Sequence, residues 1–279
     1  MDLSLCSYSF HHLLEAGKHD VFRYISDCQS LGCTQLDLWN GHLPSLLDDK
    51  TRPPSSFTPE YAQLSATELD ELARIKDAAE RAGLPFGCLA VDGAHIYEPS
   101  PEARQAQQVK AYRWLNIAGQ LGTQQIRIDT GGSPEMPDEM LEIIVNAYND
   151  LIPRAAEKGM EVVMENHWGA SRVPENVQRI LEAVPGLGLL FDTGNWPEDR
   201  REEGWELGAR HARATHLKMY AFDDDGNETT VDIPRAMHML QAAGYQGSWG
   251  IESVPRQGDE LEAAQKSIAL VHRVLGTVA

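Results

Sequence analysis

The sequence predicts an α/β fold, and within that class a single-domain (β/α)8 TIM barrel that comprises residues 1–279. Three observations support this prediction. Short apolar runs alternate with longer amphipathic stretches along the whole chain, eight of the runs have the length of a strand, and polar residues end at least five of them. The alternation indicates parallel strands joined by crossover helices, and eight such units favour a closed barrel over an open, doubly wound sheet.

The expected strands are short apolar runs bounded by turn residues. They comprise residues 3–8, 34–39, 85–91, 124–129, 160–166, 187–192, 214–220 and 247–253. The first of them is followed by SYSFHHLLEAG, which is not a glycine-rich phosphate-binding loop. A dinucleotide-binding sheet carries such a loop after its first strand, so this segment again favours the barrel.

Helical periodicity is clearest in three of the segments between the strands. In residues 67–83 the apolar residues recur at spacings of three and four, and the segment ends in glycine. Ser65 and Glu68 form the pattern of a capping box at its start. The segments 109–122 and 233–247 show the same periodicity, and each has a glycine that stops the helix.

The longest connection between these elements comprises residues 40–65 and follows the second strand. A connection of this length in a compact domain is more often a binding loop than slack, so we expect a lid or binding loop there. Trp39 and His42 at its start, and His95 after the third strand, lie on loops of the same rim. Together they are candidates for an aromatic wall against a sugar ring.

The composition restricts the classes of partner. A formal net charge of -18 repels phosphate backbones, so we expect no nucleic-acid partner. No apolar run is long enough to cross a bilayer, and MDLSLCSYSF lacks the pattern of a secretory signal, so we expect a cytoplasmic protein with no membrane partner. The sequence is compatible with a homo-oligomer. The cysteines form no C-x-x-C pair, and we expect reduced core thiols rather than disulfides or zinc ligands at Cys6, Cys28, Cys33 and Cys88.

Four potential metal ligands occur in phase on the last four expected strands. Alternate side chains of a barrel strand face the interior, and this periodicity places Glu165, Asp192, His216 and Glu252 inward at the same height. Three buried carboxylates repel one another unless a cation lies between them. Three oxygen ligands and one imidazole suit Mn²⁺, Zn²⁺, Mg²⁺ or Co²⁺. The alternative is that each acid is an isolated polar cap on a strand end.

Further polar residues share the inward phase. His167 follows Glu165 by two positions, and either transfers a proton or orients a metal ligand. Lys218 has the same relation to His216, and either donates a proton to a leaving oxygen or pairs as a structural lysine. On the fourth strand, Arg127 alternates with apolar residues, so it either binds substrate or pairs with the neighbouring acid Asp129.

Four motifs, MENHWG, FDTGNW, THLKMY and GIES, resemble the metal-bearing strand ends of the xylose-isomerase-like TIM barrels. That superfamily of sugar phosphate isomerases and epimerases also contains inosose dehydratases, ketose 3-epimerases and an apurinic endonuclease. The resemblance implies that Glu165, Asp192, His216 and Glu252 bind the metal. It further implies that Glu165 and Glu252 take and return a proton while the metal holds the charge of an enediolate.

The chain departs from the ketohexose 3-epimerases at three positions. Asn195, Phe222 and Ser171 stand where those enzymes carry a histidine, an arginine and a glutamate, and Asn195 remains a candidate for substrate binding. The resemblance implies a divalent-metal-dependent isomerase or epimerase of a sugar or keto-sugar, with a small sugar or polyol as substrate. The alternatives are a metal-dependent lyase or dehydratase acting on a keto-cyclitol or 3-keto-glycoside, and a metal-free sugar-binding barrel.

Overall fold

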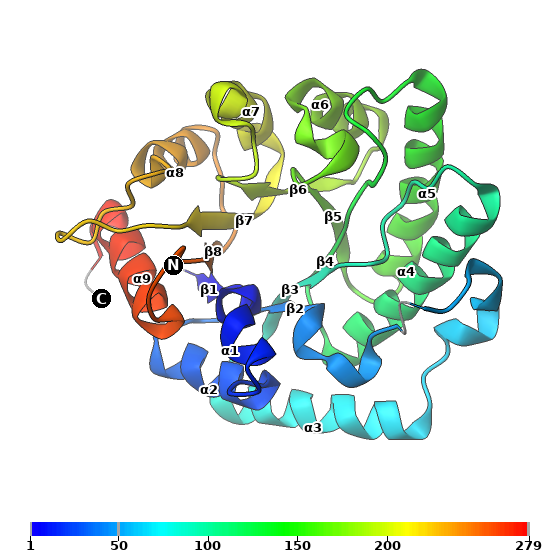
Figure 1. Ribbon diagram of the computed structural model, residues 1–279, viewed down its shortest axis with the longest axis horizontal. Helices are drawn as coiled ribbons and strands as arrows, with labels where there is room; N and C mark the ends of the chain where they lie inside the picture. The colour runs from blue at the N-terminus through cyan, green and yellow to red at the C-terminus, as the bar shows by residue number, and fades with distance from the viewer. Residues whose placement is uncertain (1, 49–50, 278–279) are drawn as a thin grey trace.

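The computed structural model describes residues 2–48 and 51–277, and within them all eight expected strands are present. The strands lie at the centre and helices surround them (Figure 1). The strands are β1 (Leu3–Leu5), β2 (Leu36–Trp39), β3 (Phe86–Val91), β4 (Gln125–Ile128), β5 (Glu161–Glu165), β6 (Gly188–Asp192), β7 (Ala212–Met219) and β8 (Trp249–Ser253). The α-helices are α1 (His11–Glu15), α2 (Val21–Ser30), α3 (Ala66–Ala82), α4 (Pro101–Leu121), α5 (Asp138–Ala156), α6 (Pro174–Ala183), α7 (Arg201–Gly208), α8 (Ile233–Ala242) and α9 (Glu260–Leu275).

The sheet closes into a barrel, as the sequence predicts. Each strand from β2 to β7 pairs in parallel with the next strand along the chain, and β8 also pairs in parallel with β1. The remaining gap between β1 and β2 is bridged by a parallel pair between Cys6 and Asp37. The carbonyl oxygen of Leu3 also accepts a hydrogen bond from the backbone nitrogen of Thr34 at 2.8 Å. These contacts leave a nearly closed TIM barrel rather than an open sheet.

The helices begin and end where local chemistry favours it. The capping box predicted at α3 is formed, with the Ser65 side chain accepting from the Glu68 backbone nitrogen and the Glu68 side chain accepting from Ser65. Gly83 ends the same helix in the left-handed conformation, with φ 73°. Helix α4 starts earlier than its apolar pattern indicates, because Ser100 caps it and Pro101 occupies its first turn. The first two turns of α4 are mostly polar, so the apolar periodicity does not extend to the start of the helix.

The connection from residue 40 to residue 65 differs from the expected lid. Its described part consists of short 3-10 turns, and the side chains of Phe57 and Ala62 are buried against Ala106 and Val109 of α4. Burying these apolar side chains favours docking on the outer helix over a free loop above the barrel. Trp39, immediately before this connection, lines the central cavity, whereas none of the described residues 40–48 and 51–65 does.

The barrel interior changes from apolar to polar along the strands. Cys88, Val163, Leu190 and Ala214 form a small buried cluster inside the barrel. All four cysteines are free and buried, which confirms the predicted reduced thiols. Among residues 2–48 and 51–277, no helix combines the length and hydrophobicity needed to cross a bilayer.

Candidate active site

The four predicted ligand residues lie directly above the apolar cluster of the barrel interior. Val163, Leu190 and Ala214 belong to that cluster, and two positions further along the same strands stand Glu165, Asp192 and His216. Alternation along a barrel strand keeps each pair on the inward face. With Glu252 from β8, the ligand atoms of the four residues all lie within 4.8 Å of one another, and all four residues are buried.

Protein cations lie between the carboxylates of this group. His216 Nδ1 lies 3.2 Å from Glu165 Oε1 and 3.2 Å from Glu252 Oε2. Lys218 Nζ lies 3.2 Å from Asp192 Oδ2 and 3.1 Å from Glu252 Oε2. Burial opposes the ionisation of Glu252, but Lys218 and His216 outweigh it and lower the pKa of Glu252 to about 2. The three acids therefore stay close together because positive groups separate them.

The Asp192 side chain is held with one oxygen free of hydrogen bonds. Its Oδ1 accepts from the backbone nitrogens of Gly194 at 2.7 Å and Asn195 at 2.8 Å. The Asn166 side chain clamps the backbone of Asp192, donating to its carbonyl oxygen at 2.8 Å and accepting from its nitrogen at 2.9 Å. Asp192 Oδ2 is buried and accepts no hydrogen bond. Burial, which Lys218 partly offsets, raises the pKa of Asp192 to about 7.

These features fit a divalent cation. A buried carboxylate oxygen that accepts no hydrogen bond and lies 3.2 Å from the Lys218 ammonium, two further carboxylates and an imidazole form a ligand set that Mn²⁺, Zn²⁺, Mg²⁺ or Co²⁺ accepts. Glu165, Asp192, His216 and Glu252 can therefore hold a metal ion, and the donor set does not select among these metals.

Arg127 of β4 forms a buried bridge between acids, which is the pairing that the sequence left open. Its Nε lies 3.2 Å from Glu165 Oε2, and its Nη1 lies 2.5 Å from Asp129 Oδ2 and 3.1 Å from Asp92 Oδ1. Burial opposes the charge of Arg127, but these acids together hold its pKa well above the usual value. Arg127 also lines the cavity described below, so contact with a substrate remains a prediction.

His167 and Asp129 form a hydrogen-bonded pair at the edge of the candidate metal site. His167 Nδ1 lies 3.1 Å from Asp129 Oδ2 and 3.9 Å from Glu165 Oε2. Burial opposes protonation of the imidazole, but Glu165 and Asp129 outweigh it and raise the pKa of His167 to about 9. Within the described residues, Nε2 of His167 makes no hydrogen bond. The ring is therefore fixed through one nitrogen, and the other is available for proton transfer.

A cavity of about 130 Å³ opens over these residues. It is lined by Cys6, Tyr8, Trp39, Ala90, Asp92, Arg127, Glu165, His167, His216, Lys218 and Glu252. Trp39 is thus at the cavity, as predicted, and its Nε1 donates to Asp92 Oδ2 at 2.7 Å. The sequence did not indicate Cys6, Tyr8 or Asp92. Cys6 and Tyr8 follow β1 at alternate positions, and this alternation is the signal that would have found them.

The family is shown by a match to most of the chain. A family model described as "Xylose isomerase-like TIM barrel" matches residues 47–273. The chain belongs to this family. The resemblance of its four strand-end motifs is thereby confirmed.

Three known proteins illustrate how far the similarity extends. An inosose dehydratase from Geobacillus thermodenitrificans is 24% identical over 174 residues, which are 51% of this chain and 57% of that enzyme. The chain thus spans little more than half the length of that relative. The structure of the IOLI protein with a bound zinc atom superimposes with a TM-score of 0.74 at 13% identity, covering 99% of this chain and 98% of that one. The 3-keto-D-glucoside 4-epimerase YcjR from E. coli gives a TM-score of 0.67 at 15% identity, covering 91% and 95% of the two chains.

Asn195 lies inside the site of this xylose-isomerase-like barrel. Its Nδ2 donates to Glu165 Oε1 at 3.2 Å, and its Oδ1 accepts from Lys218 Nζ at 3.0 Å. Asn195 therefore links the lysine to a candidate metal ligand. Its predicted contact with substrate stays a prediction.

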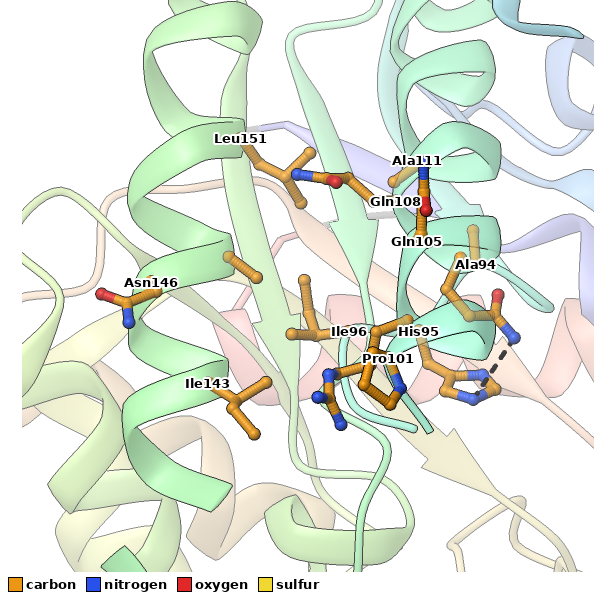
Figure 2. Close-up of a pocket in the computed structure, with 13 residues that line it drawn as sticks. Ala94, His95, Ile96, Pro101, Gln105, Gln108, Ala111, Ile143, Asn146 and Leu151 are labelled. Atoms are coloured by element: carbon orange, nitrogen blue, oxygen red, sulfur yellow. Dashed lines mark hydrogen bonds between the residues drawn. The ribbon is translucent and has the colours of Figure 1, made fainter. Parts of the chain in front are cut away.

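The two histidines expected on the rim do not line the central cavity, although His95 lines a second hollow together with Tyr97 and Trp168. His42 is 1% exposed and its Nε2 lies 3.2 Å from His19 Nδ1, so its ring points toward α2 and not into the cavity. His42 belongs to the 3-10 turn Asn40–His42 after β2, which breaks the alternation of the strand, and all three residues of the turn are buried. His95 pairs with Glu98 at 2.6 Å, and its Nε2 lies 3.5 Å from Gln107 Nε2. It borders a separate pocket of about 500 Å³ between α4 and α5 (Figure 2). His95 does not line the central cavity.

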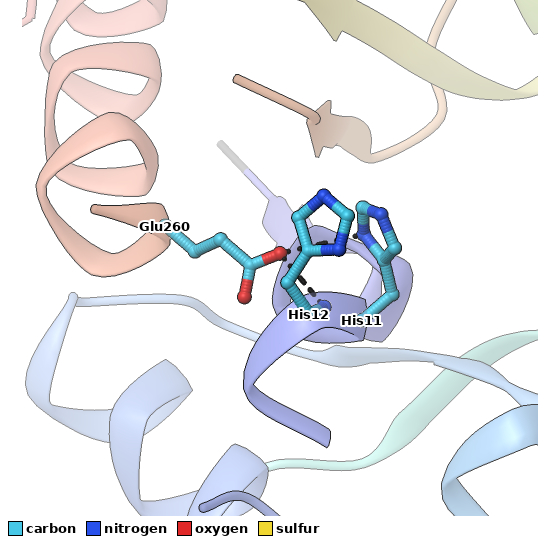
Figure 3. A group of neighbouring side chains, drawn as sticks. All are labelled: His11, His12 and Glu260. Carbon is cyan, nitrogen blue, oxygen red and sulfur yellow. Dashed lines mark hydrogen bonds and ion pairs between the residues drawn. The ribbon is translucent and has the colours of Figure 1, made fainter. Parts of the chain in front are cut away.

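A second cluster of potential ligands lies at the start of α1, where Glu260 points toward His11 and His12 (Figure 3). Both oxygens of Glu260 already accept hydrogen bonds, from the backbone nitrogens of His12 and Leu13, each at 3.0 Å. His11 Nδ1 lies 2.8 Å from the carbonyl oxygen of Tyr8. These bonds account for the cluster as a cap on α1.

Proposed function

We propose that this protein is a divalent-metal-dependent enzyme that removes the proton next to the carbonyl group of a keto-sugar or keto-polyol and returns a proton to give an isomer or epimer. The observation that carries the proposal is the convergence of Glu165, Asp192, His216 and Glu252, whose ligand atoms lie within 4.8 Å of one another. The chain belongs to the xylose-isomerase-like family, which supports the proposal that the protein is an enzyme that acts on sugars.

The reaction requires an acid-base group beside the carbonyl. Glu165, Asp192, His216 and Glu252 would hold a divalent cation, which would supply electrostatic stabilisation of the negative charge that develops on the substrate oxygens during deprotonation. His167 is the favoured proton-transfer residue, because its side chain is 31% exposed at the cavity whereas that of Glu165 is only 2% exposed. Asp129 fixes the ring through Nδ1 and leaves Nε2 for proton transfer, and the raised pKa of about 9 makes the neutral imidazole a strong base that is the minor form at neutral pH. Glu165 and Glu252 then serve chiefly as ligands.

The same deprotonated intermediate can instead lose water. The position of Lys218 beside the cavity is the observation that favours this second outcome. Burial opposes the charge of this lysine, but Asp192 and Glu252 hold its pKa well above the usual value, so it carries a proton that it can donate. An ammonium group beside the cavity can protonate a departing hydroxyl oxygen. The similarity to an inosose dehydratase supports this dehydratase reading, in which a keto-cyclitol or 3-keto-glycoside would be the substrate.

Two measurements test the proposal. The protein is first dialysed extensively against buffer, and its metal content is compared with that of Asp192→Asn and of a surface control, Asp223→Asn. We expect about one divalent ion per chain in the wild type and the control, and loss of it in Asp192→Asn. The proteins are then incubated in D₂O with keto-sugars and keto-cyclitols.

The D₂O experiment also separates the two outcomes. Deuterium at the carbon next to the carbonyl in recovered sugar supports epimerisation, whereas a new enone absorbance supports dehydration. A wild type without metal that binds sugars but exchanges no proton would instead establish a sugar-binding barrel and overturn the proposal.

A further inference from the structure

A second hollow, of about 430 Å³, lies beside the central cavity. The loops after β3, β4 and β5 form it, and its walls include Tyr97, Met140 and Trp168. These loops follow the carboxyl ends of their strands, which is the face where barrel enzymes bind their substrates. Trp168 lines the hollow, and its neighbour in the chain, His167, lines the central cavity. The two spaces therefore adjoin at these consecutive residues.

The indole of Trp168 is exposed but fixed. The residue is 41% exposed, which is unusual for an aromatic residue of this size. Its Nε1 donates to Asp129 Oδ2 at 3.2 Å, and its ring contacts His95 edge-on with 5.0 Å between the centroids. A partly exposed indole held at both ends presents a flat apolar surface that costs little entropy when a ring stacks on it.

Backbone hydrogen bonds hold together the three loops that surround the hollow. The Tyr97 nitrogen donates to the carbonyl oxygen of Thr130 at 2.8 Å, and the Ala170 nitrogen donates to that of Gly131 at 2.9 Å. The loops approach so closely that a Cβ at Gly169 would lie 2.5 Å from the Gly131 oxygen. Any larger residue at position 169 would push them apart. The hollow therefore exists before a ligand binds.

The two spaces differ in chemistry. The central cavity is small and lined by charged groups such as Lys218 and Glu252, which suits one polar ring. The adjoining hollow is lined by Tyr97, Met140 and Trp168, with His95 and Glu98 beside them, which suits a second ring that has an apolar face and polar edges. Asp129 connects them, because its Oδ2 holds both the His167 ring and the Trp168 indole.

We infer that the hollow is a subsite for a second ring of the substrate, so that the protein acts on a keto-glycoside whose keto ring lies in the central cavity and whose other ring stacks on Trp168. The inference rests on the proposed function, which places the reacting ring. The second ring is either an aromatic aglycone or another sugar, since both offer a flat apolar face.

The test compares three probes that share one keto ring: the 3-keto derivatives of methyl β-glucoside, phenyl β-glucoside and cellobiose. For the metal-loaded wild type, we expect a kcat/KM about tenfold or more higher for a two-ring probe than for the methyl probe. Phenyl and cellobiose probes distinguish an aromatic aglycone from a second sugar. Calorimetric binding of the same probes provides a readout that does not depend on turnover.

Three variants separate stacking from other effects. Trp168→Ala should abolish the advantage of the two-ring probes over the methyl probe. Because this variant also loses the hydrogen bond to Asp129, its kcat/KM for each probe is compared with that of Trp168→Phe, which loses the same bond. Trp168→Phe keeps a ring but loses the hydrogen bond to Asp129, and should retain most of the advantage. Phe22→Ala removes an aromatic side chain that is 42% exposed on α2 and should change nothing.

The outcomes also separate the two proposals. Equal kcat/KM for all three probes in the wild type, or an equal loss for all three in Trp168→Ala, would overturn the subsite. A metal-loaded wild type that neither binds nor converts any of the three probes would also overturn the subsite. The proposed function is overturned separately, by a wild type that holds no metal and exchanges no proton with any keto-sugar or keto-cyclitol.

Discussion

The ammonium nitrogen of Lys218 lies 3.1 Å from a carboxylate oxygen of Glu252, at the centre of the candidate metal site. The same nitrogen lies 3.2 Å from Asp192 Oδ2, and the lysine side chain is 11% exposed. Lys218 therefore supplies part of the positive charge that keeps two buried carboxylates side by side. A bound metal would supply the same charge, so lysine and metal stabilise the same carboxylates.

Replacing Lys218 by methionine should destabilise the metal-free protein by about 3 kcal/mol, because two buried carboxylates lose their cation. Added Mn²⁺ or Zn²⁺ should recover more stability in the variant than in the wild type. Urea unfolding with and without a chelator measures both effects. The matched control is Lys266→Met, which breaks an exposed pair with Glu262 on α9 and should have little effect. Unchanged stability of metal-free Lys218→Met would contradict this role.

The four-residue site and the cluster at the start of α1 should respond differently to metal. Ligand binding to the folded state raises the melting temperature, and Mn²⁺ or Zn²⁺ should do so in the wild type. His216→Gln should lose most of that increase, since it removes the only imidazole of the four-residue site. His11→Gln should keep it, because Glu260 is already bonded to the backbone of α1. Melting temperatures measured over a metal titration distinguish the two sites. If His11→Gln lost more of the metal-induced increase than His216→Gln, the metal site would have to be assigned to the start of α1.

His167 and Asp129 should act as a unit in proton transfer. We expect His167→Gln to slow deuterium exchange of the substrate by about 10²–10⁴-fold while metal content stays the same. Asp129→Asn should slow it less, because the imidazole remains but loses the carboxylate that orients it. His238→Gln, on the exposed face of α8, is the control. If exchange persists in His167→Gln but disappears in a metal-replete Glu252→Gln, the proton-transfer role belongs to Glu252.

The sequence predicts the phase of the barrel strands well, because period-two alternation is a local property. Val163 and Glu165 illustrate this, since one lies in the apolar cluster and the other in the metal site, two positions apart. Contacts between strands are harder to predict. The bonds from Asp129 to His167 and Trp168 depend on how two loops lie across the barrel mouth, and no spacing within the chain encodes them.

The direction of a side chain in a loop also cannot be predicted from sequence periodicity. Trp39 and His42 are three positions apart in the same loop region, yet one lines the cavity and the other is buried against His19. The 3-10 turn between them decides which way each ring points. The connection that follows docks on α4 for a similar reason, because Phe57 has an apolar partner there that the local sequence does not reveal.

The buried His42 should make the fold sensitive to acid. His19 Nε2 lies 3.3 Å from Asp27 and donates to it, so His19 Nδ1 accepts from Nε2 of His42 and leaves His42 Nδ1 buried without a partner. A proton added there has no acceptor. Burial, together with the neighbouring His19, lowers the pKa of His42 to about 3.

The sign of the pH effect follows from this depressed pKa. An unfolded histidine titrates near about 6.5, so below that pH the unfolded chain binds a proton that folded His42 refuses. The contribution of His42 to stability is complete above about pH 6.5 and is lost as the pH falls toward 3, by up to about 1.4 kcal/mol per pH unit. His42→Gln keeps an N–H donor for His19 but cannot titrate. Urea unfolding of both proteins between pH 7 and 4 should therefore show a shallower loss of stability in the variant, and parallel curves would rule out His42 as the acid-sensitive group.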